Sequence, residues 1–246
     1  MHLNKSVLLP FLLCLQPLLA PQALADYEKG IRALEAKDDQ RAAAEFLKVA
    51  PQGDHRAMMA LGALYAAGRG VPKDFTEALR WYREAARFGR ADAIYRIGLM
   101  YEGGYGMPEN RREAAKYFLE AAKKGFAEAQ LKVGTMYRDG DVFDKNPVRA
   151  SAWLKLASDT GNVDAAAALL AVREVLTPDQ RVEADLAATD YAQKYPATRK
   201  EDAPSEPPRP ERSSRPEGTP GPGGSSRSGG SSRPGGSSRP GGSSRP

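Results

Sequence analysis

The chain has 246 residues, of which 41% are hydrophobic and 27% are charged, and its formal net charge is +5. This length and balance allow one sizeable folded domain with further segments at its ends. Because the sequence holds only two histidines, His2 and His55, and one cysteine, Cys14, it excludes a metal site built from a histidine cluster and a fold held together by disulfides.

Residues 1–25 have the pattern of a secretory signal peptide. Lys5 gives a positive start, an apolar stretch covers residues 7–20, and Ala23-Leu24-Ala25 resembles a cleavage site. The apolar stretch is shorter than the about 20 residues that cross a bilayer as a helix. We therefore predict cleavage after Ala25, no transmembrane span after cleavage, and a periplasmic or secreted location.

Residues 26–53 predict an opening pair of helices. The first helix is expected at about residues 27–36, and the second follows Asp38. Asp38 and Gly53 stand 36 positions before Asp74 and Gly89, which mark a similar helix in the next segment. The first helix lacks the signature of the later segments, as the terminal units of repeat proteins often do.

Three units with a period of 36 residues follow, at residues 54–89, 90–125 and 126–161. A fixed period of this length predicts a stacked solenoid. Each unit contains a glycine that follows an aliphatic residue and precedes a tyrosine by three positions: Gly62, Gly98 and Gly134.

Within each unit we expect two helices whose apolar faces pack together. Leu61 and Tyr65 lie four residues apart, on one face of a first helix. Ala78, Trp81 and Ala85 share one face of a second helix. The glycine and the alanines are small where we expect the two helix backbones to approach each other.

The second helices have recognisable start and end signals. Asp74 and Asn110 each stand three residues before a glutamate, as in a capping box, and Asn146 precedes a proline. In the turn before the last of these helices, Val142 replaces the glycine of the two earlier turns, so we expect that turn to have a different shape. Left-handed glycines are expected where the second helices end, at Gly89, Gly125 and Gly161.

Residues 162–195 predict a further first helix at residues 164–175 and a capping helix that begins near Thr177-Pro178. The composition changes in residues 196–246, which are rich in arginine, glycine, serine and proline and have almost no large apolar residue. We predict that this segment is a disordered tail. It also holds the basic excess of the mature chain.

The repeated pattern Ala-x-x-x-Leu-Gly-x-x-Tyr-x-x-Gly-x-Gly-Val-x-x-Asp-x-x-x-Ala-x-x-Trp-Tyr-x-x-Ala-Ala-x-x-Gly resembles the Sel-one-like repeat (SLR) family, which is related to tetratricopeptide repeats. The resemblance extends from about Asp26 to Tyr195. It implies an all-α fold, namely an α/α solenoid in which antiparallel helix pairs form a right-handed superhelix. It also implies a protein that binds other macromolecules and has no chemistry of its own.

The sequence displays no recognised catalytic motif. It contains no Ser-x-x-Lys, no Gly-x-Ser-x-Gly and no phosphate-binding Gly-x-x-x-x-Gly-Lys-Ser/Thr. His55 is expected to be a solvated surface histidine. The acidic turn with Asp139, Asp141 and Asp144 has Phe143 where an EF-hand loop needs a ligand. We therefore predict no catalytic residue, no cofactor and no metal site.

Recognition of a partner is expected at positions that differ between units on one face of the first helices. Three such positions in each unit are spaced four and three residues apart and fall on one stripe. They are similar to the positions that line the concave surface of tetratricopeptide repeats. We hypothesise that this stripe is a groove that binds a protein or peptide, formed by Tyr95, Leu99, Glu102, Leu131, Thr135 and Arg138.

Together these patterns favour a non-enzymatic exported adaptor or scaffold. One alternative is an envelope hydrolase or β-lactam-binding protein of the SLR type, for which the sequence displays no nucleophile. Another is a cell-envelope polymer binder whose tail arginines hold a polyanion. Nucleic acid is disfavoured as a partner, because no aromatic residues alternate with the arginines of the tail to stack on bases.

Overall fold

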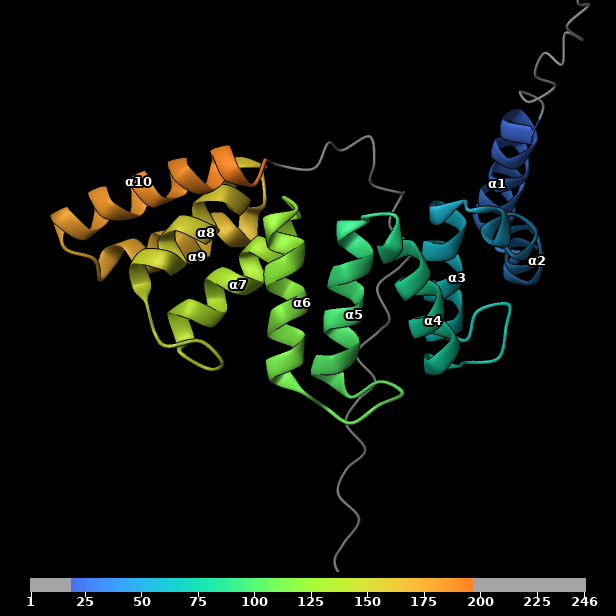
Figure 1. Ribbon diagram of the computed structural model, residues 1–246, viewed down its shortest axis with the longest axis horizontal. Helices are drawn as coiled ribbons and strands as arrows, with labels where there is room; N and C mark the ends of the chain where they lie inside the picture. Colours follow the sequence, from blue (N-terminus) through green and yellow to red (C-terminus); the bar gives the residue numbers. More distant parts are fainter. Residues whose placement is uncertain (1–18, 197–246) are drawn as a thin grey trace, which may run out of the picture. The chain divides into compact units, whose positions relative to one another are not determined.

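Figure 1 shows the computed structural model, which describes residues 19–196 and the side chains of residues 26–196. This part of the chain contains ten α-helices, one short 3-10 helix and no strand. The predicted all-α fold is therefore confirmed. Residues 1–18 of the predicted signal peptide and residues 197–246 of the predicted tail lie outside the described residues.

The helices follow one another as antiparallel pairs, in which α1 packs on α2, α3 on α4, α5 on α6 and α7 on α8. Contacts of α2 with α3, α4 with α5 and α6 with α7 join consecutive pairs, which is the arrangement of an α/α solenoid. The helices are α1 (Leu19–Glu35), α2 (Asp39–Val49), η1 (Ala50–Gln52), α3 (His55–Ala67), α4 (Phe75–Arg87), α5 (Ala91–Gly103), α6 (Arg111–Lys123), α7 (Ala127–Asp139), α8 (Pro147–Asp159), α9 (Val163–Glu174) and α10 (Pro178–Lys194).

A glycine of each first helix receives a large side chain of the second helix. A Cβ atom on Gly98 would lie 2.6 Å from the ring of Phe118, and one on Gly134 would lie 2.7 Å from Cγ of Leu154. Both of these large side chains are fully buried. The expectation that the glycine lets two backbones approach is thus refined, because the space is filled by a side chain of the second helix.

The opening pair uses the same contact. Gly30 of α1 lies against the ring of Phe46 in α2, as Gly62 lies against Tyr82. The pattern was missed in the sequence because Gly30 precedes Gly62 by 32 positions rather than by the 36 of the repeat. The α1 helix also begins earlier than expected, at Leu19, and passes through the predicted cleavage position.

The predicted N-cap residues are confirmed, but α4 and α6 lack the full capping box, because the N–H groups of Asp74 and Asn110 donate to the carbonyls of Tyr65 and Tyr101 rather than to a glutamate. The Asp74 side chain accepts hydrogen bonds from the backbone N–H groups of Thr76 and Glu77, and Asn146 caps α8 with Pro147 as its first residue. At the start of α10, Thr177 and Gln180 form a full capping box. Asn110 caps α6 by accepting one hydrogen bond, from the backbone N–H group of Glu113.

The turns between first and second helices depend on left-handed glycines. Gly68, Gly104 and Gly140 all end their helices with positive φ. Gly70 is also left-handed, at φ 70°, but Val142 at the equivalent point of the third unit is not. The third turn therefore differs in shape, as predicted from the valine.

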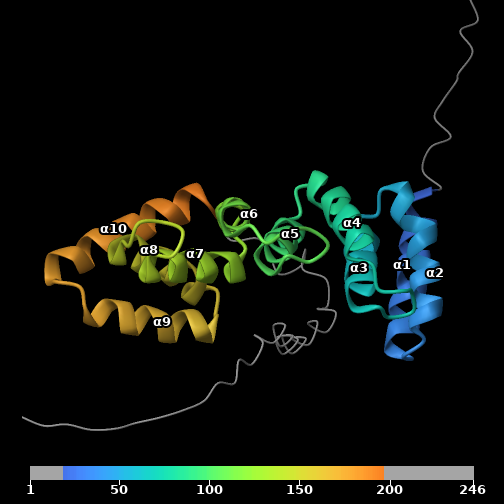
Figure 2. The same cartoon turned by 90° about the horizontal axis from the view of Figure 1, so that it is seen from below.

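The C-terminal end departs from the simple succession of pairs. Both α9 and α10 pack on α8, and they lie on different sides of it (Figure 2). The rings of Tyr191 and Tyr195 near the end of α10 lie 4.7 and 5.7 Å from the Trp153 ring of α8. Thus α10 covers the second helix of the third unit and does not complete a fourth pair with α9.

No helix among residues 19–196 is both long enough and apolar enough to cross a membrane.

Candidate functional site

The six residues of the predicted groove are all half-buried on two first helices. The turn of a helix every 3.6 residues brings each set of three to one side of its helix. Tyr95, Leu99 and Glu102 lie on α5, and Leu131, Thr135 and Arg138 lie on α7.

The apolar members of the groove contact neighbouring elements. The ring of Tyr95 lies 5.3 Å from the ring of Phe118 in α6 and 5.2 Å from the ring of Phe126, the residue before α7. Leu99 packs on the same cluster of buried residues. Leu131 packs on a cluster contributed by α8, α9 and α10. These three side chains therefore help to join successive units.

The polar members of the groove also have partners within the chain. Glu102 forms an ion pair with Lys132 at 2.9 Å, which links α5 to α7. The Thr135 hydroxyl donates a hydrogen bond to the Lys132 carbonyl at 2.8 Å. Arg138 donates two hydrogen bonds to Asp139, and these hold the pKa of the Asp139 carboxyl below its ordinary value.

Two residues that the sequence argument missed are Phe126 and Lys132. Phe126 occupies the N-cap position of α7, where Asp54 stands before α3. An aromatic residue at a position that favours Asp, Asn, Ser or Thr was a visible signal of packing. Lys132 could not be found in this way, because its pairing with Glu102 depends on how two units stack.

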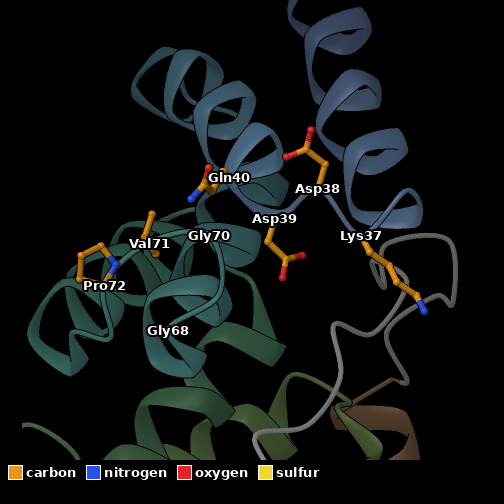
Figure 3. A pocket seen from close by; sticks show the side chains of 8 residues that line it. All are labelled: Lys37, Asp38, Asp39, Gln40, Gly68, Gly70, Val71 and Pro72. Carbon is orange, nitrogen blue, oxygen red and sulfur yellow. The ribbon is translucent and has the colours of Figure 1, made fainter.

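A pocket of about 490 Å³ lies where the turn between α3 and α4 meets the start of α2 (Figure 3). The carboxylate of Asp39 on its wall accepts hydrogen bonds from Arg69 at 2.7 and 2.8 Å. A Cβ atom on Gly70 would overlap the backbone of Asp39, so the turn rests directly on the preceding second helix. The pocket is lined by Lys37, Asp38, Asp39, Gln40, Gly68, Gly70, Val71 and Pro72.

The turn of each repeat contacts the second helix of the preceding unit, and we call this contact a joint. At each of the three joints, a residue of the helix meets the residue 30 positions later, in the turn. The first joint is the ion pair of Asp39 with Arg69. The second is a contact between the rings of Phe75 and Tyr105, with centroids 5.0 Å apart. The third is again an ion pair, but the charges are exchanged, because Arg111 now lies on the helix and Asp141 on the turn. Each joint thus has its own chemistry.

His55 is more enclosed than expected. Its ring lies 5.9 Å from the ring of Phe88, and its Nδ1 atom is buried without a hydrogen-bond partner. Burial, followed by the positive charge of Arg90, lowers the pKa of His55. His55 is thus half-buried rather than fully solvated, with the Phe88 ring beside it.

Among residues 26–196, no group of three or more His, Cys, Asp or Glu side chains is arranged to hold a metal ion. In the acidic turn, Asp139 is paired with Arg138 and Asp141 with Arg111. These carboxylates serve ion pairs within the fold.

Comparison with known proteins supports the resemblance drawn from the sequence. The family model for the Sel1 repeat matches residues 55–87, 91–126 and 127–162. A crystal structure of a Sel1 repeat protein from Oxalobacter formigenes is 33% identical, covers 70% of this chain and 73% of its own, and has a TM-score of 0.60. A search of curated proteins finds no match.

Two further solved structures are less similar. A protective antigen with an SLR fold from uropathogenic Escherichia coli is 23% identical, with 70% of this chain and 46% of that chain covered and a TM-score of 0.45. An immunity protein from Pseudomonas aeruginosa is 20% identical, with 73% and 83% covered and a TM-score of 0.37. The Sel1 repeat is a protein-interaction fold that is generally non-enzymatic. By its three matched repeats and its identity to the Oxalobacter protein, this chain belongs to the Sel1 repeat family.

Proposed function

We propose that this protein is a non-enzymatic, exported adaptor that binds a peptide or protein through the first helices of its repeats. The observation that carries the proposal is the match of three consecutive units to a repeat used for protein interaction. The signal-like pattern of residues 1–25 supports a periplasmic or secreted location.

The stripe on α5 and α7 offers mixed chemistry to such a partner. Leu99 and Leu131 expose part of an apolar surface, while Glu102 and Arg138 place opposite charges at its end. Binding sites commonly combine a central apolar contact with polar groups that set orientation. A peptide or loop with both kinds of side chain fits this stripe best.

Site-specific photocrosslinking tests the proposal. A photoreactive residue is placed at Arg138 in the chain expressed in its own host, and captured proteins are identified by mass spectrometry. A matched variant carries the same residue at Arg112, which is exposed on the second helix α6. We expect a discrete crosslinked product from position 138 that position 112 does not form. Identical products from both positions, or none from either, would contradict the proposed site.

A further inference from the structure

The last first helix, α9, has an open apolar face. Its sequence, Val-Asp-Ala-Ala-Ala-Ala-Leu-Leu-Ala-Val-Arg-Glu, is apolar nearly all round, which is typical of a helix covered on several sides. Yet Val163 is 79% exposed and Leu170 is 67% exposed. These residues and Ala167 lie at positions i, i+4 and i+7, so they form one stripe.

Comparison with the complete units identifies what is missing from this face. Ile97 and Val133 are buried in their units, but Leu169, at the equivalent position, is only half-buried. Leu170 stands where Gly98 and Gly134 receive a large side chain from the second helix. In the fourth unit, therefore, the place of the second helix is open, because α10 packs on the other side of α8.

The identity of Leu170 indicates the shape of a helix that would fit. In the complete units, Phe118 and Leu154 fill the space above a glycine. A leucine at that point occupies the space itself, so a helix packed on α9 must present a small residue there. This is the reverse of the arrangement in the three repeats, where the glycine lies on the first helix and the large side chain on the second.

The charges on α9 indicate which charge a partner helix should carry. Asp164 and Glu174 are exposed near its two ends. Its one basic residue, Arg173, is held by Asp185 of α10 in a pair of hydrogen bonds at 2.6 and 3.0 Å. An apolar face between exposed carboxylates favours a helix with basic flanks and disfavours a second α9 of the same charge.

We propose that the open face of α9 docks a basic amphipathic helix of a protein partner, which takes the place of a second helix in the fourth unit. This rests on the proposed role in protein binding but assigns a surface apart from the stripe on α5 and α7. The tail is unsuited to this role, because residues 197–246 contain no Val, Leu, Ile, Met, Phe, Tyr or Trp.

The chain itself supplies a probe of the required kind. The α6 segment, residues 110–125, is a second helix with five basic and two acidic residues. A fluorescent peptide of this segment is made with Phe118→Ala to leave room for Leu170, and a second peptide keeps Phe118. The α4 segment, residues 74–89 with Tyr82→Ala, has three basic and three acidic residues and serves as the charge control.

Fluorescence anisotropy then measures binding of the peptides to the purified chain. We expect the Phe118→Ala peptide to bind roughly fivefold tighter than the Phe118 peptide, and Leu170→Gly in the chain to reverse this order. The α4 peptide should bind more weakly than the Phe118→Ala peptide at low salt, and high salt should reduce the difference. Leu170→Asp should abolish binding, whereas Leu186→Asp, at an equally exposed leucine of α10, should leave it unchanged.

Equal affinity for the two α6 peptides in both forms of the chain would overturn the proposal, as would no binding at millimolar peptide. Self-association of the chain that is lost with Leu170→Asp in sedimentation velocity would assign the face to a second copy and also overturn it. None of these outcomes depends on the photocrosslinking at Arg138, so failure here leaves the proposed function to its own test.

Discussion

Where a glycine contacts a ring in this fold, there is no space for even one added carbon atom. Phe118 is fully buried above Gly98, so its ring has little room to move away from an added methyl group. Interiors packed at this density respond to a change of one carbon. The glycines of the first helices are therefore required by packing against a neighbouring side chain, although a helix interior otherwise favours alanine.

We predict that Gly98→Ala destabilises the protein by about 1–2 kcal/mol, because overpacking of about 1–3 kcal/mol exceeds the gain in helix propensity of up to about 1 kcal/mol. Urea unfolding followed by circular dichroism measures the change. In a Phe118→Leu background, which provides space, the same substitution should cost less. An equal cost in both backgrounds would show that the ring is not the cause.

Tyr82 predicts a specific response to alkaline pH. Burial raises its pKa to about 12, against an ordinary value of 10. The unfolded chain loses this proton at lower pH than the folded chain does. The contribution of Tyr82 to the free energy of unfolding is therefore constant below about pH 10 and falls between about pH 10 and 12, by roughly 2–3 kcal/mol for two pKa units. Tyr82→Phe should remove this part of the loss. Parallel stability curves for the two proteins between these pH values would contradict the prediction.

At the scale of elements, the three joints between a turn and the preceding second helix are equivalent in position and different in chemistry. An ion pair, an aromatic pair and a reversed ion pair occupy positions that coincide under the 36-residue period. Pairs of opposite or like charge distinguish correct from incorrect neighbours more strongly than they add stability. The joints thus favour one register of the units.

Charge exchange at the first joint tests this interpretation. Arg69→Asp places two carboxylates together and should cost about 1 kcal/mol, as expected for a partly exposed pair. Adding Asp39→Arg should restore most of the loss, although an arginine at the start of α2 is less favourable by about 0.3–1 kcal/mol. Thermal unfolding of the two single variants and the double variant measures the coupling. Additive losses in the double variant would mean that the pair does not interact.

Much of this element structure was predictable from local signals. The capping residues Asp74 and Asn146 and the valine at position 142 predicted helix starts and the shape of the third turn. Gly30 was not recognised, because the connection between α1 and α2 is shorter than those within the repeats and shifts Gly30 out of the 36-residue period. The candidate groove was harder, since side chains that vary between units, such as Tyr95, can serve contacts between units as well as contacts with a ligand.

At the scale of the whole described molecule, the C-terminal helices are arranged differently from the helix pairs of the repeats. The sequence predicted a first helix and a capping helix after Gly161, and α9 and α10 are present. It did not show that α10 would pack on α8. That packing involves Trp153, whose two tyrosine neighbours lie about 40 residues later in the sequence and contact it only after the chain has folded back.

We predict that Trp153 controls the attachment of α10. Trp153→Ala removes the surface that receives Tyr191 and Tyr195 and should cost about 3–5 kcal/mol, as for other buried aromatic residues. Hydrogen exchange should accelerate most in α10. Leu186→Ala, on the exposed side of the same helix, is the matched control and should leave exchange unchanged. Faster exchange spread evenly over all helices would contradict this local role.

The three joints also have a genetic consequence. An in-frame duplication of residues 54–89 would preserve the period, yet it would set the second copy of Arg69 against the first copy of Phe75. Deletion of residues 90–125 would set Asp141 against the same phenylalanine. Recombination between units therefore replaces the native pair at a joint even when it keeps the reading frame. A change in the number or order of the repeats thus removes a native contact at a joint, which a point substitution elsewhere leaves in place.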